Sequence, residues 1–313
     1  MKHLLALEQL SQEEILEILN LADQLKFQKK NKIEHHLLKG KTLGMIFQKS
    51  STRTRVSFEV GMYELGGQAL FLSSRDLQIG RGEPVEDTAR VLSRYLDGIM
   101  IRTFAQKEVE DLAKYGSIPV INALTDYCHP CQVLADLMTI REFKGAFDGL
   151  KCVYIGDGNN MANSIIVGCL RLGMKMAIAC PKGYEPHPHI LEFTKSYPGM
   201  FTLTTDVMEA AADGDVFFTD VWASMGQESE AMERKKIFKG YQINSKVLSV
   251  AHTDAMVLHC LPAHREEEIT AEVFEAHAAE IFEEAENRLH AQKAVLVLSL
   301  IHISEPTRPL YIS

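Results

Sequence analysis

Hydroxyl and guanidinium side chains are concentrated in one short segment, Ser50-Ser51-Thr52-Arg53-Thr54-Arg55. The segment follows an apolar run at 42–47 and precedes a run with helical spacing, so we expect it between a strand and the start of a helix. Helix-start amides and the helix dipole favour an anion, and a guanidinium pairs with two oxygens at once. The segment therefore indicates a phosphate site, with an ordinary helix cap and two solvated arginines as the alternative.

A second polar segment, His129-Pro130-Cys131-Gln132, stands between a predicted strand and a predicted helix. His129 and Gln132 could donate hydrogen bonds to a carbonyl oxygen, whereas a capping turn with a packed histidine is the simpler alternative. Cys128 and Cys131 also form a Cys-x-x-Cys pair, which is a redox motif in proteins with a thioredoxin-like context that this chain lacks. Zinc would need a second ligand pair at comparable spacing, and the neighbouring sequence offers none.

A third segment, residues 156–161, follows a predicted strand and opens a helix. Its glycines resemble the beginning of a dinucleotide-binding motif, but Met161 occupies the third glycine position. The next strand also lacks the acidic residue that would hold a ribose. Asn159 and Asn160 are better interpreted as amide hydrogen-bonding groups facing a crevice, or as turn formers.

Two further strand ends carry polar residues. Asp220 follows the run 216–219 and could pair with a substrate ammonium group, and we expect Ser224-Met225-Gly226 to form a mobile loop. Cys260 follows the run 256–259. It could be a nucleophile or a soft positioning group, although a single buried cysteine is usually inert.

The elements that must position these residues alternate between helix and strand, beginning with a helix that a capping box at Ser11 and Glu14 opens. Such alternation predicts βαβ units, and two series of them predict an α/β protein of two domains, each a mostly parallel sheet flanked by helices. The candidate residues then lie past the carboxyl ends of parallel strands, where ligands bind in open α/β sheets. After the first helix, helices are predicted at 56–65, 86–95, 108–114, 133–143, 161–172, 190–196, 207–212 and 270–293, and strands at 42–47, 69–72, 98–101, 120–122, 151–155, 174–179, 201–203, 216–219 and 256–259.

We place the two domains at residues 1–145 and 146–300, joined by the helix that follows His129. Residues 301–313 break the pattern, because Pro306 and Pro309 stop any helix. This tail is either a docking segment or a remnant foreign to the fold, and we favour the remnant.

The composition of the chain excludes several classes of protein. The chain has 313 residues, of which 46% are apolar and 24% charged, which excludes disordered and fibrous proteins. No apolar run reaches the roughly 18 residues of a membrane span, and the N-terminus does not resemble a signal peptide. A net charge of −9 argues against nucleic acid or an anionic membrane as a partner. Six cysteines in so long a chain, without a secretory signal, favour free thiols and a cytoplasmic location.

Taken in order, these motifs resemble the aspartate/ornithine carbamoyltransferase family, and within it the ornithine-specific members. The resemblance covers about residues 1–300. It implies two α/β domains with the active site in the cleft between them, a homotrimer, and transfer of a carbamoyl group from carbamoyl phosphate to the δ-amine of L-ornithine. It implies no metal and no cofactor.

The resemblance also assigns roles to individual residues. Those implied to act in catalysis are Arg53, Arg102, His129 and Cys260. Those implied to bind carbamoyl phosphate are Ser51, Thr52, Arg53, Thr54, Gln78, Arg102, His129, Gln132, Cys260, Leu261 and Arg288, with Gln78 reaching the site of a neighbouring subunit. Those implied to bind ornithine are Asn159, Asn160, Asp220, Ser224 and Met225.

Three other functions remain open at this point. The first is carbamoyl transfer to another amine, such as putrescine or an acylated ornithine, against which Asp220 and the segment 224–226 argue. The second is an NAD-linked dehydrogenase, against which Met161 argues. The third is a phosphate-binding module without catalysis, which detectable citrulline would exclude.

Overall fold

The computed structural model describes residues 2–223, 226 and 228–301. Of the predicted tail 301–313, all but residue 301 lies outside these residues. The chain divides into two compact units. Unit 1 comprises residues 1–6, 13–125 and 289–313, and unit 2 comprises residues 7–12 and 126–288. The helix after His129 thus belongs to unit 2, while the functional boundary placed at residue 145 stays a prediction.

Unit 1 contains a four-stranded parallel sheet in the order β2-β1-β3-β4. Central strands β1 and β3 are apolar and buried almost throughout, as a sheet covered on both faces requires. The strands are β1 (Thr42–Phe47), β2 (Gln68–Ser73), β3 (Gly98–Arg102) and β4 (Val120–Leu124). The helices are α1 (Gln12–Lys30), α2 (Thr52–Glu64), α3 (Val85–Leu92) and α4 (Gln106–Tyr115), with 3-10 turns η1 (Leu7–Gln9, in unit 2) and η2 (Gln78–Arg81).

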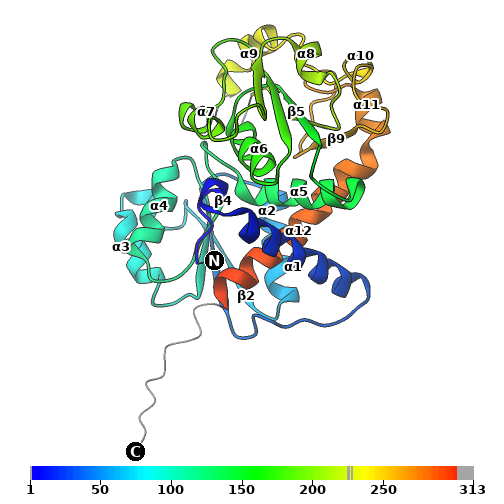
Figure 1. Ribbon diagram of the computed structural model, residues 1–313. Coiled ribbons are helices and arrows are strands. Elements are labelled where there is room, and N and C mark those ends of the chain that lie inside the picture. Colours follow the sequence, from blue (N-terminus) through cyan, green and yellow to red (C-terminus); the bar gives the residue numbers. More distant parts are fainter. Residues whose placement is uncertain (1, 224–225, 227, 302–313) are drawn as a thin grey trace, which may run out of the picture. The chain divides into compact units, whose positions relative to one another are not determined.

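Unit 2 contains a five-stranded parallel sheet in the order β7-β6-β5-β8-β9. The helices around it are visible in Figure 1. The strands are β5 (Lys151–Ile155), β6 (Lys175–Ala179), β7 (Phe201–Thr204), β8 (Val216–Thr219) and β9 (Met256–His259). The other elements are α5 (Pro130–Lys144), α6 (Asn160–Arg171), α7 (Pro188–Thr194), α8 (Val207–Ala211), η3 (Glu228–Glu230), α9 (Ala231–Ile237), α10 (Ser245–Leu248), α11 (Ala271–Ala276) and α12 (Ala278–Leu300), of which α12 continues into unit 1.

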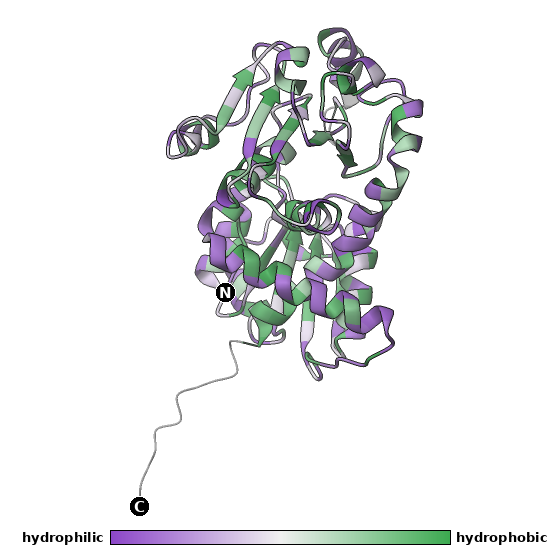
Figure 2. Ribbon diagram, turned by 45° about the vertical axis from the view of Figure 1, so that its right-hand side comes forward, coloured by the Kyte–Doolittle hydropathy of each residue, from purple (hydrophilic) through white to green (hydrophobic). Residues whose placement is uncertain are grey.

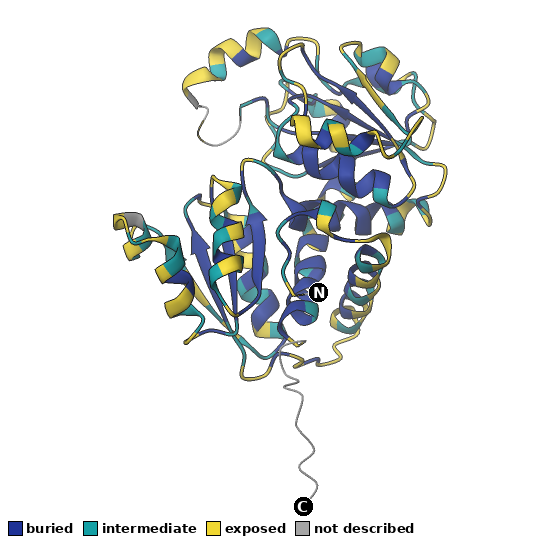
Figure 3. Ribbon diagram, turned by 60° about the vertical axis from the view of Figure 1, so that its left-hand side comes forward, coloured by how far each residue is buried: buried dark blue, intermediate teal, exposed yellow. Residues whose placement is uncertain are grey.

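Each sheet is held by its own apolar core. In unit 1, Ile46, Ile99 and Ile101 pack with Val109 and Leu112 of α4. In unit 2, the core joins sheet residues to helices that cover one face, α8, α10 and α11. The central strands are hydrophobic and buried, the edge strands β2 and β7 are partly exposed, and many helices show polar, exposed outer faces (Figures 2 and 3). Full burial of each such side chain contributes about 1.5–3 kcal/mol.

The predicted single helix over 270–293 is wrong. Two helices occupy this region, because His277 adopts φ −107° and ψ 16° and thereby ends α11. His277 Nδ1 lies 2.6 Å from Glu280 Oε2 in the first turn of α12. The short helices α9 and α10 were also not predicted; each buries a single residue, Arg234 and Val247 respectively.

Candidate active site

The unit 1 candidates gather where the strand order reverses. From β1 the chain proceeds to β2 on one side, and it later returns through β3 to β4 on the other. Phe47 at the end of β1 pairs with Arg102 at the end of β3, so the segment after β1 and the Arg102 side chain leave the same edge of the sheet. Crevices at such reversals are the usual ligand positions in open parallel sheets.

The segment after β1 leads directly into α2. Ser51 is the N-cap residue, and its Oγ accepts a hydrogen bond from the backbone N–H of Thr54 at 3.2 Å. Thr52 is exposed, Arg53 is half-buried and Thr54 is buried. The capping alternative therefore holds for the Ser51 side chain. It does not compete with anion binding, because a capped helix start still presents positive backbone dipoles.

The two arginines of the segment differ in their surroundings. Arg55 Nε donates to Glu59 Oε1 at 3.1 Å, and its guanidinium lies 3.8 Å from the centre of the Phe71 ring. Arg55 is therefore already engaged on the side of α2 that faces β2. Arg53, the arginine that the resemblance places in catalysis, is the half-buried one of the two.

Lys49 was not among the predicted residues of this segment. It stands two residues past β1, is buried, and holds its Nζ 4.4 Å from the centre of the Phe104 ring. A lysine directly ahead of a hydroxyl cluster was the available signal. Two other predicted residues of unit 1 are Arg102, which is buried at the end of β3, and Gln78, which is exposed at the start of η2.

The unit 2 candidates also gather at a reversal of strand order, between β5 and β8. Asn159 follows β5 and Asp220 follows β8, and Asn159 Nδ2 donates to Asp220 Oδ2 at 2.9 Å. The other oxygen, Asp220 Oδ1, accepts from the backbone N–H of Val221 at 2.8 Å and from the Cys260 thiol at 3.3 Å. An amide, a backbone N–H and a thiol therefore fix this carboxylate, which is suited to a substrate ammonium group.

Asn159 forms hydrogen bonds through both ends of its side-chain amide. Its Oδ1 caps α6 by accepting from the N–H groups of Met161 at 2.9 Å and Ala162 at 3.2 Å, while its Nδ2 holds Asp220. The Asn159 amide is thus a positioning group for Asp220. Asn160 is the first residue of α6.

Backbone packing, and not a bound dinucleotide, explains the glycine at position 158. A Cβ atom on Gly158 would lie 2.4 Å from the backbone of Glu185 and Pro186. The Gly158 N–H donates to the Tyr184 carbonyl at 2.8 Å. Gly158 therefore permits a close approach of two backbone segments, which argues against the pyrophosphate-binding interpretation.

Two of the cysteines, Cys260 and Cys131, act as thiols and not as thiolates. Burial, followed by the charge of Asp220, raises the pKa of Cys260 well above its usual value, so the thiol donates to that carboxylate. Burial also raises the pKa of Cys131 to about 12, and Cys128 is buried as well. A reactive cysteine needs access and a lowered pKa, so neither the nucleophile nor the redox interpretation fits.

The segment after β9 is held by His259, whose side chain is fully buried. Its Nδ1 accepts from the backbone N–H of Leu261 at 2.9 Å, so Nε2 carries the proton and donates to Glu268 Oε1 at 2.9 Å. Leu261, with φ 59°, adopts a left-handed conformation that this bond helps to hold. Glu268 had no sequence signal, because the contact exists only in the folded chain.

The remaining predicted residues of unit 2 are His129, Gln132, Arg288, Ser224 and Met225. His129 is buried at the N-cap of α5, where its backbone N–H donates to Ser164 Oγ at 2.8 Å. Arg288 Nη1 donates to Gln132 Oε1 at 2.7 Å, which brings these two predictions together. Ser224 and Met225 lie outside the described residues.

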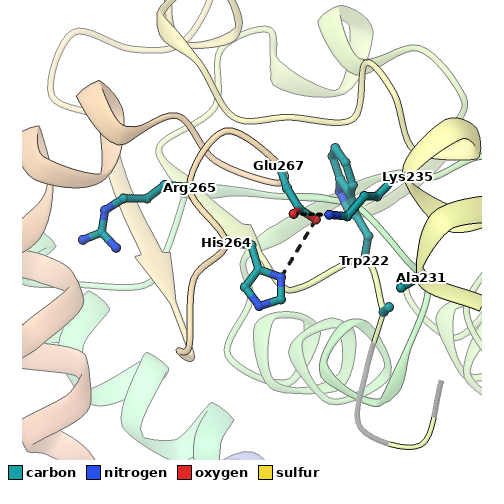
Figure 4. Close-up of a pocket in the computed structure, with 7 residues that line it drawn as sticks. Trp222, Ala231, Lys235, His264, Arg265 and Glu267 are labelled. Atoms are coloured by element: carbon teal, nitrogen blue, oxygen red, sulfur yellow. Dashed lines mark ion pairs between the residues drawn. The ribbon is translucent and has the colours of Figure 1, made fainter. Parts of the chain in front are cut away.

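A pocket of about 370 Å³ adjoins the chain just past Asp220. It is lined by Trp222, Ala223, Ala231, Lys235, His264, Arg265 and Glu267. Lys235 and His264 both face the Glu267 carboxylate, at 2.7 Å and 3.9 Å, whereas Arg265 points away (Figure 4). Three of the lining residues, Lys235, His264 and Glu267, therefore already pair with one another.

Among the described residues, no group of three or more histidine, cysteine, aspartate or glutamate side chains could hold a metal ion. None of the described helices is long and apolar enough to cross a membrane.

Comparison with known proteins covers nearly the whole chain. Residues 2–142 match the family described as aspartate/ornithine carbamoyltransferase, carbamoyl-P binding domain, and residues 148–299 match its Asp/Orn binding domain. The ornithine carbamoyltransferase of Oceanobacillus iheyensis is 56% identical over 296 residues, which are 93% of this chain and 92% of that protein. The enzyme of Carboxydothermus hydrogenoformans is 55% identical over 300 residues, 95% and 96% of the two chains. The solved structure of ornithine carbamoyltransferase from Pyrococcus furiosus matches with a TM-score of 0.91 and 51% identity, over 97% of this chain and 98% of that one.

Proposed function

Since the chain belongs to the aspartate/ornithine carbamoyltransferase family, we infer that it is an ornithine carbamoyltransferase. It transfers the carbamoyl group of carbamoyl phosphate to the δ-amine of L-ornithine and releases L-citrulline and phosphate. The observation that carries this conclusion is the fixed Asp220 carboxylate at the β5/β8 reversal, which offers one charge to the α-ammonium group of an amino acid.

In the proposed mechanism the unit 1 residues bind the leaving group. The phosphate lies on the start of α2, where Ser51, Thr52, Arg53 and Thr54 supply donors, and on Arg102. Two guanidiniums and helix-start amides stabilise the charge that phosphate carries away. No covalent enzyme intermediate, metal or cofactor takes part.

The unit 2 residues bind and orient ornithine. Asp220 pairs with the α-ammonium group, Asn160 holds the amino-acid end, and the Cys260 thiol lies near the attacking δ-amine. Ser224 and Met225 complete this part of the proposal from sequence alone. His129, with Arg102 and Thr54, donates to the carbonyl oxygen as the tetrahedral intermediate forms, which is where electrostatic stabilisation counts most.

A single assay tests the function. Purified protein is given carbamoyl phosphate and L-ornithine, and citrulline and phosphate are measured together. We expect equal amounts of both, with putrescine and N-acetylornithine giving a small fraction of the ornithine rate. Phosphate binding without citrulline would refute catalysis, and faster turnover of either other amine would move the specificity to that substrate.

We further propose that the protein is a homotrimer. The family resemblance implies it, and the exposed apolar side chains of α2 and β2, among them Val56, Tyr63, Leu70 and Phe71, offer a surface for a second copy. In this assembly the exposed Gln78 reaches the site of the neighbouring subunit. Light scattering should give three times 35.1 kDa. A monomer with full activity would refute both the trimer and the role of Gln78.

The proposal extends to cytoplasmic arginine metabolism, since citrulline is the product and buried free thiols suit a reducing compartment. Complementation of a citrulline-requiring host, with the protein recovered from its soluble cytoplasmic fraction, tests this extension. A protein that restores growth only when it is exported would contradict it.

A further inference from the structure

Two buried carboxyl groups of unit 2 have no role in the mechanism above. Asp136 lies on α5 and Glu284 on α12, and each is about 1% exposed. Burying an ionised carboxyl is costly unless it is paired and hydrogen-bonded. Their immediate neighbours, Gln132 and Arg288, are both residues that the family resemblance assigns to carbamoyl phosphate.

The side-chain amide of Gln132 is the centre of this cluster. Its Nε2 donates to Asp136 Oδ1 at 2.9 Å and to Glu284 Oε1 at 2.8 Å, and its Oε1 accepts from Arg288 Nη1 at 2.7 Å. An amide has one acceptor end and one donor end with two protons. Because both protons are taken by carboxyl oxygens, the Oε1 end must point to Arg288.

Glu284 connects this amide to a second part of the site. Its Oε2 accepts from the backbone N–H of His259 at 2.8 Å. His259 directly precedes Cys260 and positions Leu261. One carboxylate therefore sets both the orientation of the Gln132 amide and the end of β9.

We propose that Glu284 is a positioning residue for carbamoyl phosphate binding, and that its ionised carboxylate acts on Arg288 through the Gln132 amide while the neighbouring Asp136 is protonated. This assignment rests on the proposed function. It also changes the role of Gln132, which acts by holding Arg288 and not by donating its amide protons to the substrate.

The hydrogen bonds locate the proton. Of the four carboxyl oxygens, Asp136 Oδ1 and both oxygens of Glu284 accept from N–H groups, whereas Asp136 Oδ2 receives none among the described residues. Burial, followed by the proximity of the two carboxyls to one another, raises the pKa of Glu284, and burial raises that of Asp136 to about 7, so the pair holds a proton. The two N–H donors that Glu284 accepts, one on each oxygen, place that proton on Asp136. One proton on Asp136 Oδ2 leaves a single negative charge on Glu284, which the positive charge of Arg288 opposes.

Two substitutions of equal shape separate the carboxyls. Asp136→Asn keeps an acceptor for Gln132 and places an NH₂ group where the protonated oxygen lies, so we expect all kinetic constants within about threefold of the wild type. Glu284→Gln places an NH₂ group against either the Gln132 amide or the His259 N–H, so one hydrogen bond must break. We expect its KM for carbamoyl phosphate to rise about tenfold or more, with the KM for ornithine within twofold.

Glu142→Gln is the matched control. Glu142 also lies on α5 and accepts from Asn287 of α12 at 2.8 Å, a bond that glutamine can still accept. This variant should behave as the wild type. An equal effect of Asp136→Asn and Glu284→Gln, or a shift of both KM values together, would overturn the proposal.

A second measurement covers the case in which Glu284→Gln lowers stability. In a Gln132→Met background, Glu284→Gln should add no further rise in the KM for carbamoyl phosphate, because the two act in one chain of contacts. An additive rise would overturn the proposal. Wild-type protein that makes no citrulline would refute the proposed function itself, whereas an active wild type with an unaffected Glu284→Gln variant refutes only the positioning role.

Discussion

Both units have their candidate residues at the strand-order reversal of a parallel sheet, but the surroundings of these residues differ. In unit 1 the candidate groups stand at a helix start, and Thr52 and Arg53 are exposed and half-buried. In unit 2 the carboxylate of Asp220 is held by three donors from three separate segments. The difference fits the ligands: a phosphate is an anion that needs donors, whereas the α-ammonium group of ornithine needs a carboxylate that is held in one direction.

A test of the unit 1 set should give the largest effect. Arg53→Ala removes a guanidinium from the start of α2, and we expect kcat/KM for carbamoyl phosphate to fall by ~10³, or about 4 kcal/mol. Arg55→Ala is the matched control, because Arg55 pairs with Glu59 and Phe71. Initial rates of citrulline formation measure both. Similar losses in the two variants would show that the segment acts only through its overall charge.

The unit 2 set should give a smaller and more selective loss. Asp220→Asn keeps the shape but removes the charge, so we expect the KM for ornithine to rise by ~10², with the KM for carbamoyl phosphate within threefold. Asp206→Asn serves as the control, since Asp206 caps α8 through acceptor bonds that asparagine reproduces. A rise in both KM values would mean that Asp220 supports the fold and does not select the amine.

Glycine substitution can test the backbone packing next to the candidate ornithine-binding residues of unit 2. Gly158→Ala would place a Cβ atom 2.4 Å from the backbone of residues 185–186, so we expect a loss of about 2–3 kcal/mol in the free energy of unfolding. Gly61→Ala in α2 meets only side chains, Lys293 at 3.2 Å and Leu289 and Leu296 at 3.7 and 3.9 Å, and gains helix propensity, so its stability should change by less than about 1 kcal/mol. Denaturant unfolding compares them. Equal losses would mean that the approach at Gly158 relaxes at little cost.

Mild acid should act on the two units in opposite directions. In unit 1, burial lowers the pKa of His290 to about 3, whereas the unfolded chain protonates this residue near pH 6.5. The stability of unit 1 therefore falls as pH drops from about 7 towards 3, by up to about 1.4 kcal/mol per pH unit for this group. In unit 2, the raised pKa of Asp136 means that the folded state takes up a proton between about 7 and 3.8, so stability there rises.

Hydrogen exchange at pH 7 and pH 5 measures each unit separately. Protection should fall in unit 1 before unit 2, and His290→Leu should flatten the dependence in unit 1. His252→Leu is the control, because His252 is exposed and Asp215 raises its pKa. Parallel loss of protection in both units would contradict the assignment of these pKa directions.

Much of the fold could be predicted from local patterns. Apolar runs at 42–47, 151–155 and 256–259 match β1, β5 and β9, because buried parallel strands are continuously apolar. The break at His277 could not be predicted, since the flanking residues all favour helix. The helices α9 and α10 were missed because short helices depend on packing more than on their own sequence.

The sequence by itself determined which residue types follow which strand, and so the chemistry of the site: hydroxyls and Arg53 after β1, amides after β5, Asp220 after β8 and Cys260 after β9. Only the tertiary structure decided how these groups are used. It places the Arg55 guanidinium against the Phe71 ring and makes the Asn159 amide a donor to Asp220. It also makes the Gln132 amide a donor to Glu284, which lies 152 positions away in the sequence. The reason is physical: strand periodicity is a local property, whereas hydrogen-bond partners and buried charges are fixed by the order in which strands and helices pack.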